Sequence, residues 1–579
     1  MIHHFSSAIM IQLRKRFERL YGPAADLCLE RLAMMVGRYG IGFDLSQPHM
    51  RWDQRQTVLI TYGDMIRNAD EKPLVTLKRF ADEHLKGALS TIHLLPFFPY
   101  SSDDGFSVIH FRTVNPEFGA WDDVQRLGKC FRLMFDLVLN HVSRESGWFR
   151  DYQLNTAPGR DYFIEVDPSA DLSSVVRPRS SQLLMSVNTA SGLRHVWTTF
   201  SSDQVDLNYS NPDVLFEMLD ILLFYVSMGA RVIRLDAIAY VWKKIGTKSI
   251  HLTETHELVK LFRDVLEVVS PDVTLLTETN VPHLENISYF GNSDEAHMVY
   301  QFSLPPLLLY TFLSGNACYL TKWAESLADP PPGCYFLNFT ASHDGIGIRP
   351  LEGLLPDEDI QELVRQVRKR GCRISTRRSG DGTDKPYEMN ITYFDALSVP
   401  EGTPQEFHIS RFLCSQMIVL AMKGIPAVYF NSLVAAANDY VLAEQTGHAR
   451  SLNRTKWDES DLMAKLNDSS TCSSKVFNEY LRILRIRTKH TSFHPDGEQR
   501  VLDFGDHVFS IERVALDESE RILAIHNVSA DAVTILAERL TASGFEPGVG
   551  SNLIGDQAVY DSEGNVILGP YESVWLCFS

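Results

Sequence analysis

Eight short apolar runs, most of them separated by segments with helical spacing, constrain the fold of this chain more than any other feature. Apolar runs of this length are typical of strands that are buried on both faces, as in a parallel sheet. Parallel strands need long crossover connections, which helices commonly supply. The pattern therefore predicts an α/β protein built on a (β/α)8 TIM barrel. The runs are 57–62, 91–95, 131–136, 231–236, 273–278, 298–302, 334–339 and 427–430.

Helix start and stop signals flank the run at 231–236. Asn211 precedes Pro212, a pairing typical of a helix start, and Gly229 is placed to end that helix before the run begins. The helix that follows the run is predicted to end at Ser270, because a proline comes next. Strand and helix signals thus alternate as a barrel requires.

The remaining stretches predict further parts of the chain. Helical spacing in residues 1–53 indicates an N-terminal helical extension, and the barrel is expected to occupy 54–140 and 206–492. Residues 141–205 and an insertion at 345–404 are too long for simple crossovers, and loops of this length at one rim are usually functional lids. Short alternating runs in 493–579 predict a C-terminal all-β domain.

Charge and composition exclude several classes of function. The formal net charge of -18 argues against a nucleic-acid partner and against an anionic membrane surface. The most apolar run, 215–226, contains Glu217 and Asp220 and is too short to span a bilayer. The first residues lack the features of a signal peptide, and the eight cysteines are scattered. We expect buried thiols in a cytoplasmic protein, with no metal site and no cofactor.

Acidic side chains stand at the ends of several predicted strands. Asp236 ends the run at 231–236, Glu278 ends the run at 273–278, and Asp344 follows a later run. A lone Asp at a strand end often only caps the next helix. Three carboxylates over one barrel mouth are unfavourable unless chemistry uses them, because like charges repel. The sequence therefore predicts an active site at this rim, with Asp236 as the first candidate for a catalytic residue.

The strand-end segments resemble the four hallmark motifs of the α-amylase family. The resemblance covers nearly the whole chain after residue 54, and it implies a barrel, an inserted B domain at 141–205 and a C-terminal β-sandwich. It also implies retaining glycosyl transfer, in which two carboxyl groups flank the glycosidic bond. The motifs are Asp136 to Asn140-His141, Arg234-Leu-Asp236-Ala237, Glu278, and His343-Asp344.

The resemblance implies a role for each matching position. Asp236 corresponds to the nucleophile, held ionised by Arg234, and Glu278 to the general acid/base with a raised pKa. Asp344, with His343 beside it, is expected to hold sugar hydroxyls and to favour the distorted ring of the transition state. The family motif also makes His141 an expected sugar contact.

A narrower resemblance, carried by the segment 101–108, is to the sucrose phosphorylases and their relatives. It implies that Asp103, Phe106 and Arg454 close a pocket around a single glucose, which is transferred to inorganic phosphate. Over its full length the chain is most similar to the glucosylglycerate phosphorylases. The expected reaction converts the small molecules 2-O-α-glucosylglycerate and phosphate to α-glucose 1-phosphate and glycerate. Candidates for contacting phosphate or the acceptor are Arg177, Arg179, Arg194 and Lys244, beside Lys243 and Lys248.

The sequence leaves three alternatives open. Sucrose, sucrose 6-phosphate or glucosylglycerol could replace glucosylglycerate as the donor. An α-glucosidase or transglucosidase would share the first half-reaction and differ only in the acceptor, so phosphate dependence separates it. A non-catalytic binding barrel is the third alternative. The three carboxylates and Arg234 argue against it, because a binding module gains nothing from crowded like charges.

Overall fold

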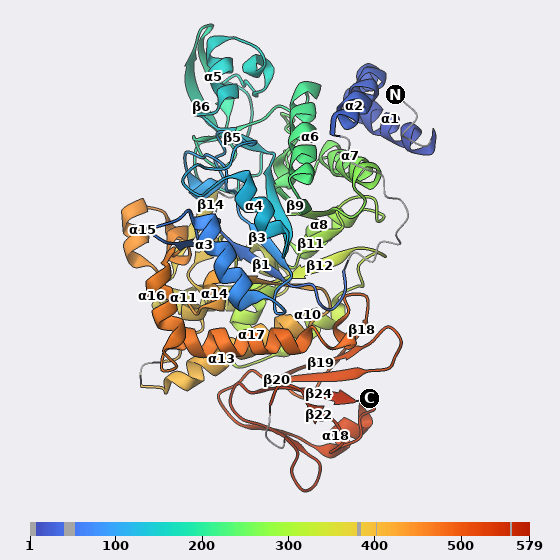
Figure 1. Cartoon of the computed structure of the whole chain (residues 1–579), viewed down its shortest axis with the longest axis vertical. Coiled ribbons are helices and arrows are strands. Elements are labelled where there is room, and N and C mark those ends of the chain that lie inside the picture. Colours follow the sequence, from blue (N-terminus) through green and yellow to red (C-terminus); the bar gives the residue numbers. More distant parts are fainter. Residues whose placement is uncertain (1–6, 40–51, 379–383, 401, 556–558, 579) are drawn as a thin grey trace.

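A computed structural model of the chain describes residues 7–39, 52–378, 384–400, 402–555 and 559–578. Eight parallel strands close into a barrel in the order β1-β16-β12-β11-β10-β9-β4-β3, which confirms the predicted TIM barrel (Figure 1). Each predicted run overlaps one barrel strand. The strands are β1 (Val58–Thr61), β3 (Thr91–Leu94), β4 (Arg132–Val138), β9 (Ala230–Asp236), β10 (Thr274–Thr277), β11 (Met298–Tyr300), β12 (Tyr335–Asn338) and β16 (Ile425–Tyr429).

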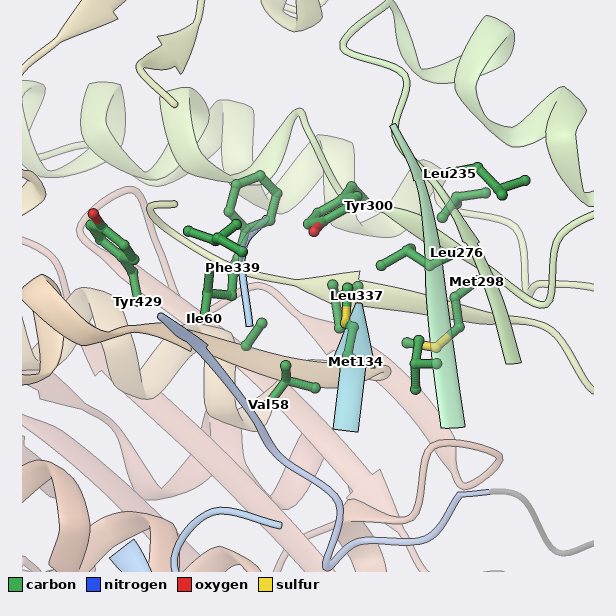
Figure 2. Close-up of a cluster of buried hydrophobic side chains, with 14 of the residues drawn as sticks. Val58, Ile60, Met134, Leu235, Leu276, Met298, Tyr300, Leu337, Phe339 and Tyr429 are labelled. Carbon is green, nitrogen blue, oxygen red and sulfur yellow. The ribbon is translucent and has the colours of Figure 1, made fainter. Parts of the chain in front are cut away.

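The barrel strands are apolar because both of their faces are covered. Side chains from several strands fill a cluster of buried residues, in which Val58, Met134 and Leu276 come from β1, β4 and β10 (Figure 2). Helices cover the outside, and α6 begins at the predicted Pro212, where the Asn211 side chain accepts a hydrogen bond from the Asp213 N–H. The main covering helices are α3 (Pro73–Phe80), α4 (Trp121–Gly128), α6 (Pro212–Ser227), α7 (Thr253–Val269), α9 (Leu304–Ser314), α10 (Cys318–Ser326), α13 (Gln405–Ala421) and α17 (Cys472–Arg487).

Two long insertions follow β4 and β12. The first contains β5 (His141–Ser143), α5 (Gly147–Leu154), β6 (Leu184–Thr189), β7 (Gly192–Trp197) and β8 (Gln204–Asp206). The second contains β13 (Ile346–Gly347), α11 (Asp357–Lys369), β14 (Arg373–Arg378) and β15 (Asp384–Asn390), whose strands form a sheet in the order β13-β15-β14. Residues 379–383 and 401 of the predicted insertion lie outside the described residues.

Two N-terminal helices, α1 (Ser7–Tyr21) and α2 (Ala25–Tyr39), lie beside α6 and α7 (Figure 1). The buried Phe17 ring stacks on Phe216 of α6 at a centroid distance of 6.0 Å. Arg16 of α1 pairs with Glu257 at 3.3 Å and with Asp264 at 3.0 Å, both on α7. Residues 1–6 and 40–51 of the predicted extension lie outside the described residues.

Antiparallel sheets make up most of the C-terminal part (Figure 1). The larger sheet has the order β18-β19-β20-β24-β22, and β21 pairs with β23. A short helix, α18 (Ala537–Ala542), also lies here and was not expected from the sequence. The strands are β18 (Glu498–Leu502), β19 (Val508–Val514), β20 (Arg521–Asn527), β21 (Val533–Ile535), β22 (Ser551–Asn552), β23 (Val566–Leu568) and β24 (Ser573–Phe578).

The described helices include none with the length and apolar character needed to cross a bilayer. All eight cysteines are free thiols, and four of them are buried. Cys318, Cys472 and Cys577 are half-buried and Cys130 is exposed, so the expectation of buried thiols is met only in part and is wrong for Cys130. It lies at the turn between α4 and β4, where the chain is at the surface.

Candidate active site

A cavity at the carboxyl-terminal rim of the barrel brings the three predicted carboxylates together. Asp236 is the last residue of β9, Glu278 directly follows β10, and Asp344 lies in the loop after β12. The shared direction of parallel strands places these three positions at one rim. Other lining residues are Asp103, Phe106, His141, Arg179, Phe200, Gln204, Tyr240, Asn280, His343, Tyr387, Glu388 and Arg450.

A buried chain of charged side chains orients Asp236. Arg234 Nη1 donates to Asp236 Oδ1 at 2.7 Å and also to Asp136 Oδ1. Asp136 in turn accepts a hydrogen bond from His93 Nε2 at 2.6 Å. Because Arg234 and Asp136 are almost fully buried, the guanidinium is fixed beneath the cavity and directly favours the anionic form of Asp236.

Glu278 lies in the same cavity but is held differently. Its Oε2 accepts a hydrogen bond from the Ala237 N–H at 3.0 Å and lies 4.0 Å from Arg234 Nη2. Burial raises the pKa of both Asp236 and Glu278 to about 7. Since the guanidinium hydrogen-bonds Asp236 directly, the proton that the two groups share near neutral pH belongs on Glu278. This is the protonation pattern of a nucleophile paired with a general acid.

The raised pKa of Glu278 predicts a stability effect that depends on pH. Between the ordinary value of 4.5 and about 7 the unfolded chain loses this proton while the folded chain keeps it, so rising pH lowers the stability. Glu278→Gln removes the buried charge and should stabilise the protein at pH 8 by about 1–3 kcal/mol. Thermal unfolding of both proteins at pH 8 and pH 5 measures this. An equal difference at the two pH values would contradict the assignment.

Asp344 is ionised and paired within the cavity. Its Oδ1 lies 2.5 Å from Arg450 Nη1, and its Oδ2 lies 3.4 Å from His343 Nε2. Burial alone would raise the pKa of Asp344, but the charges around it, of which Arg450 is the largest, together outweigh burial and hold that pKa well below its usual range. Burial lowers the pKa of His343 to about 3, so this ring is neutral at physiological pH. It stacks on Phe106 with 4.6 Å between ring centroids.

The segment 103–106 forms one wall of the cavity. Arg454 donates from Nη1 to Asp103 Oδ1 at 3.1 Å and from Nε to the His343 carbonyl oxygen at 2.9 Å. His141 Nε2 lies 3.0 Å from the carbonyl oxygen of Phe106. Asp103 has φ 52°, an unusual conformation for a residue with a side chain, which the surrounding contacts must hold in place. Of the expected glucose contacts, Asp103, Phe106, His141 and His343 line the cavity, whereas Arg454 is not among its lining residues and braces Asp103 and His343 from behind.

Lys243 is committed to a buried network. Its Nζ donates to Asn140 Oδ1 and lies near Asp206 Oδ2, each at 2.6 Å, and its side chain is only 2% exposed. Thr199 donates to Asp206 from its backbone N–H at 2.8 Å. Lys243 therefore joins β8 to the end of β4 and does not act as a ligand for phosphate.

Lys243→Met should destabilise the fold. The change leaves Asp206 buried without its cation, which costs about 3–5 kcal/mol. Thermal unfolding measures the loss. Lys244→Met is the matched control, because the neighbouring Lys244 is exposed and its loss should change little. Similar midpoints for Lys243→Met and the wild type would contradict this account.

The predicted basic residues do not all reach the cavity. Arg179 lines the cavity, whereas Arg177, Arg194 and Lys244 are not among its lining residues. Arg194 lies on β7 of a hairpin and pairs with Glu165 at 3.3 Å. These residues were proposed because they lie near the motifs along the chain, but that nearness does not determine which way their side chains point.

Several cavity residues were not foreseen from the sequence. Arg450 lies in the 3-10 helix Ala449–Asn453, which ends just before the predicted Arg454. A second arginine so close to Arg454 was the sequence signal that could have identified Arg450 as a cavity residue. Glu388 and Tyr387 lie on β15 inside the second insertion, where no motif marks them. Tyr240 follows β9 and Asn280 follows β10, so both share the strand-end position of the predicted carboxylates.

Similar proteins were found by family, by sequence and by structure, and the three comparisons agree with one another. The α-amylase family, by its catalytic domain, matches residues 86–322. Glucosylglycerate phosphorylase from Spirochaeta thermophila is 49% identical over 483 residues, covering 82% of this chain and 81% of the relative. The enzyme of that name from Allomeiothermus silvanus is 43% identical over 559 residues, covering 96% of each chain. The fold is also that of the crystal structure of sucrose 6F-phosphate phosphorylase from Thermoanaerobacter thermosaccharolyticum, with a TM-score of 0.72, 24% identity, and coverage of 84% of this chain and 96% of that one.

These matches confirm the resemblance first seen in the strand-end motifs. With identities of 43–49% over most of both sequences, the chain belongs to the glucosylglycerate phosphorylase family, within the larger α-amylase family.

Proposed function

We propose that this chain is a retaining phosphorylase that converts 2-O-α-glucosylglycerate and phosphate to α-glucose 1-phosphate and glycerate. The observation that carries the proposal is the near full-length likeness to glucosylglycerate phosphorylases, at 43% identity over 96% of the chain. The cavity supports it, because Asp236, Glu278 and Asp344 meet there. The partners are small molecules, and the cytoplasmic location expected from the sequence stays a prediction.

In the first step Asp236 attacks the anomeric carbon. Glu278 gives its proton to the bridging oxygen, so glycerate leaves with a hydroxyl group and a β-glucosyl ester forms on Asp236. Arg234 keeps the nucleophile ionised, and Asp344 holds sugar hydroxyls where positive charge develops on the ring. Asp103, Phe106, His141, His343 and Arg454 enclose the glucose.

In the second step a phosphate oxygen attacks the anomeric carbon from the face that glycerate left. The ester bond to Asp236 breaks and α-glucose 1-phosphate is released, while Glu278 recovers a proton from the attacking phosphate. Phosphate and the acceptor carboxylate occupy the same space in turn, and both are anions. Arg179 is the predicted basic residue at this cavity and can therefore serve both.

The identity of the acceptor is tested by comparing the rates of phosphorolysis of four donors. The purified protein is given phosphate with 2-O-α-glucosylglycerate, sucrose, sucrose 6-phosphate or glucosylglycerol, and kcat/KM is measured for release of glucose 1-phosphate. We expect glucosylglycerate to give the highest value, because its carboxylate meets a basic side chain. A higher value for sucrose, sucrose 6-phosphate or glucosylglycerol would show that glycerate is not the acceptor, although the catalytic residues would keep their roles.

A further inference from the structure

A single buried carboxylate, that of Glu388, joins three segments that meet over the cavity. Arg450 donates to both of its oxygens, from Nη2 to Oε1 at 2.8 Å and from Nε to Oε2 at 3.1 Å. Arg179 Nη1 lies 3.9 Å from the same Oε2. Glu388 belongs to β15, Arg450 to the 3-10 helix Ala449–Asn453, and Arg179 to the segment between α5 and β6. Two insertions and the segment that carries Arg454 are therefore tied together at one side chain.

The position of Glu388 is closely defined by its surroundings. Its side chain is 1% exposed. Gly345, which directly follows Asp344, leaves the space that Glu388 fills, because a Cβ there would lie 2.4 Å from Glu388 Cγ. Arg450 is shared between Glu388 and Asp344, so it also links this carboxylate to the glucose side of the cavity.

The two arginines around Glu388 are used differently. Arg450 is engaged by two carboxylates through Nε, Nη1 and Nη2. Arg179 makes no hydrogen bond to any other part of the chain that the structure describes, and its guanidinium carbon lies 5.6 Å from the centre of the Tyr387 ring. A guanidinium has five N–H donors in a fixed geometry. Arg179, whose side chain is 24% exposed, therefore keeps donors available to a ligand in the cavity.

A carboxylate beside a site for anions would ordinarily repel them. The two-point pairing with Arg450 largely offsets the charge of Glu388. The remaining negative charge of Glu388 attracts the Arg179 guanidinium across 3.9 Å. This distance is short enough to orient the guanidinium but too long for a hydrogen bond that would occupy its N–H donors. Without Glu388, Arg179 would be drawn toward the other carboxylates of the cavity.

We propose that Glu388 is a positioning residue for the two anions of the reaction, phosphate and the acceptor carboxylate. Glu388 is held by Arg450 and fixes the orientation of the Arg179 guanidinium. The available N–H donors of Arg179 then bind phosphate during phosphorolysis and the acceptor carboxylate during the reverse reaction. This inference rests on the proposed function and adds to it the residue that sets the preference for an anionic acceptor.

The test separates anion binding from glucosyl transfer. KM for phosphate is measured with glucosylglycerate for the wild type, Glu388→Gln, Arg179→Lys and the double variant. The initial burst of fluoride release from α-glucosyl fluoride without phosphate, before water hydrolyses the ester, reports formation of the glucosyl-enzyme from a neutral donor. Glu352→Gln is the matched control, since Glu352 lies in the same insertion and pairs with Arg377 at 2.9 Å while 49% exposed.

We expect Glu388→Gln to raise KM for phosphate about tenfold or more, while fluoride release changes less than about threefold. Arg179→Lys should act in the same way, and the double variant should be no worse than Arg179→Lys alone, because both changes disable one guanidinium. Glu352→Gln should match the wild type in both assays.

Three results would overturn the inference. One is an unchanged KM for phosphate in Glu388→Gln, and another is an equal loss in both assays, which would indicate a purely structural role. Additive effects in the double variant would show that Glu388 does not act through Arg179. A wild type that consumes glucosylglycerate equally fast without phosphate would overturn the proposed function as well, whereas a wild type that needs phosphate for this donor confines any failure to Glu388.

Discussion

Asp236→Ala should reduce kcat by at least about 10⁴-fold, the largest effect expected from any single substitution in this chain. The side chain is the proposed nucleophile, and Arg234 holds it ionised through a direct hydrogen bond of 2.7 Å. Without it, no glucosyl-enzyme can form. Initial rates of glucose 1-phosphate release from glucosylglycerate measure the loss.

A folded variant is the necessary control for this result. Circular dichroism and thermal unfolding should show an intact protein, because removing a buried carboxylate with a pKa raised to about 7 relieves like-charge crowding. Near-native turnover by Asp236→Ala would contradict the proposed mechanism. So would a product of inverted configuration from the wild type.

Glu278→Ala should lose activity selectively, according to the leaving group. General acid catalysis contributes about 10²–10⁴-fold, and glycerate needs protonation to leave. Fluoride leaves without a proton, so α-glucosyl fluoride should retain much more of the wild-type rate of fluoride release. The ratio of kcat/KM for the two donors is the measurement.

The matched comparison for Glu278 is its neighbour in the same cavity. Asp236→Ala should lose activity equally on both donors, because the nucleophile is needed for either leaving group. If Glu278→Ala also loses activity equally on both donors, the assignment of Glu278 as the general acid is wrong. The raised pKa of Glu278 would then reflect burial alone.

The barrel was predictable from the sequence because its strands are buried on both faces. Such strands appear as apolar runs, and all eight runs overlap barrel strands in the structure. The strands β14 and β15 were missed, since their segments Arg373–Arg378 and Asp384–Asn390 are rich in charged residues. Their pairing depends on contacts within the insertion, which local sequence does not show.

The catalytic carboxylates were predictable for a different physical reason. Parallel strands place their carboxyl ends at one rim, so strand-end positions far apart in the chain identify neighbours in space. No such rule connects Glu388 with Arg450, which are 62 residues apart and meet only because two loops fold over the cavity. Likewise, no pattern in the sequence shows that Arg194 turns toward Glu165 while Arg179 lines the cavity.

The most direct test of the account follows the products by NMR. The purified protein is incubated with 2-O-α-glucosylglycerate, with and without inorganic phosphate, and the anomeric proton and phosphorus signals are recorded. We predict α-glucose 1-phosphate and glycerate in equal amounts, with turnover that depends on phosphate. Free glucose formed at the same rate without phosphate, or β-glucose 1-phosphate as the product, would contradict the account.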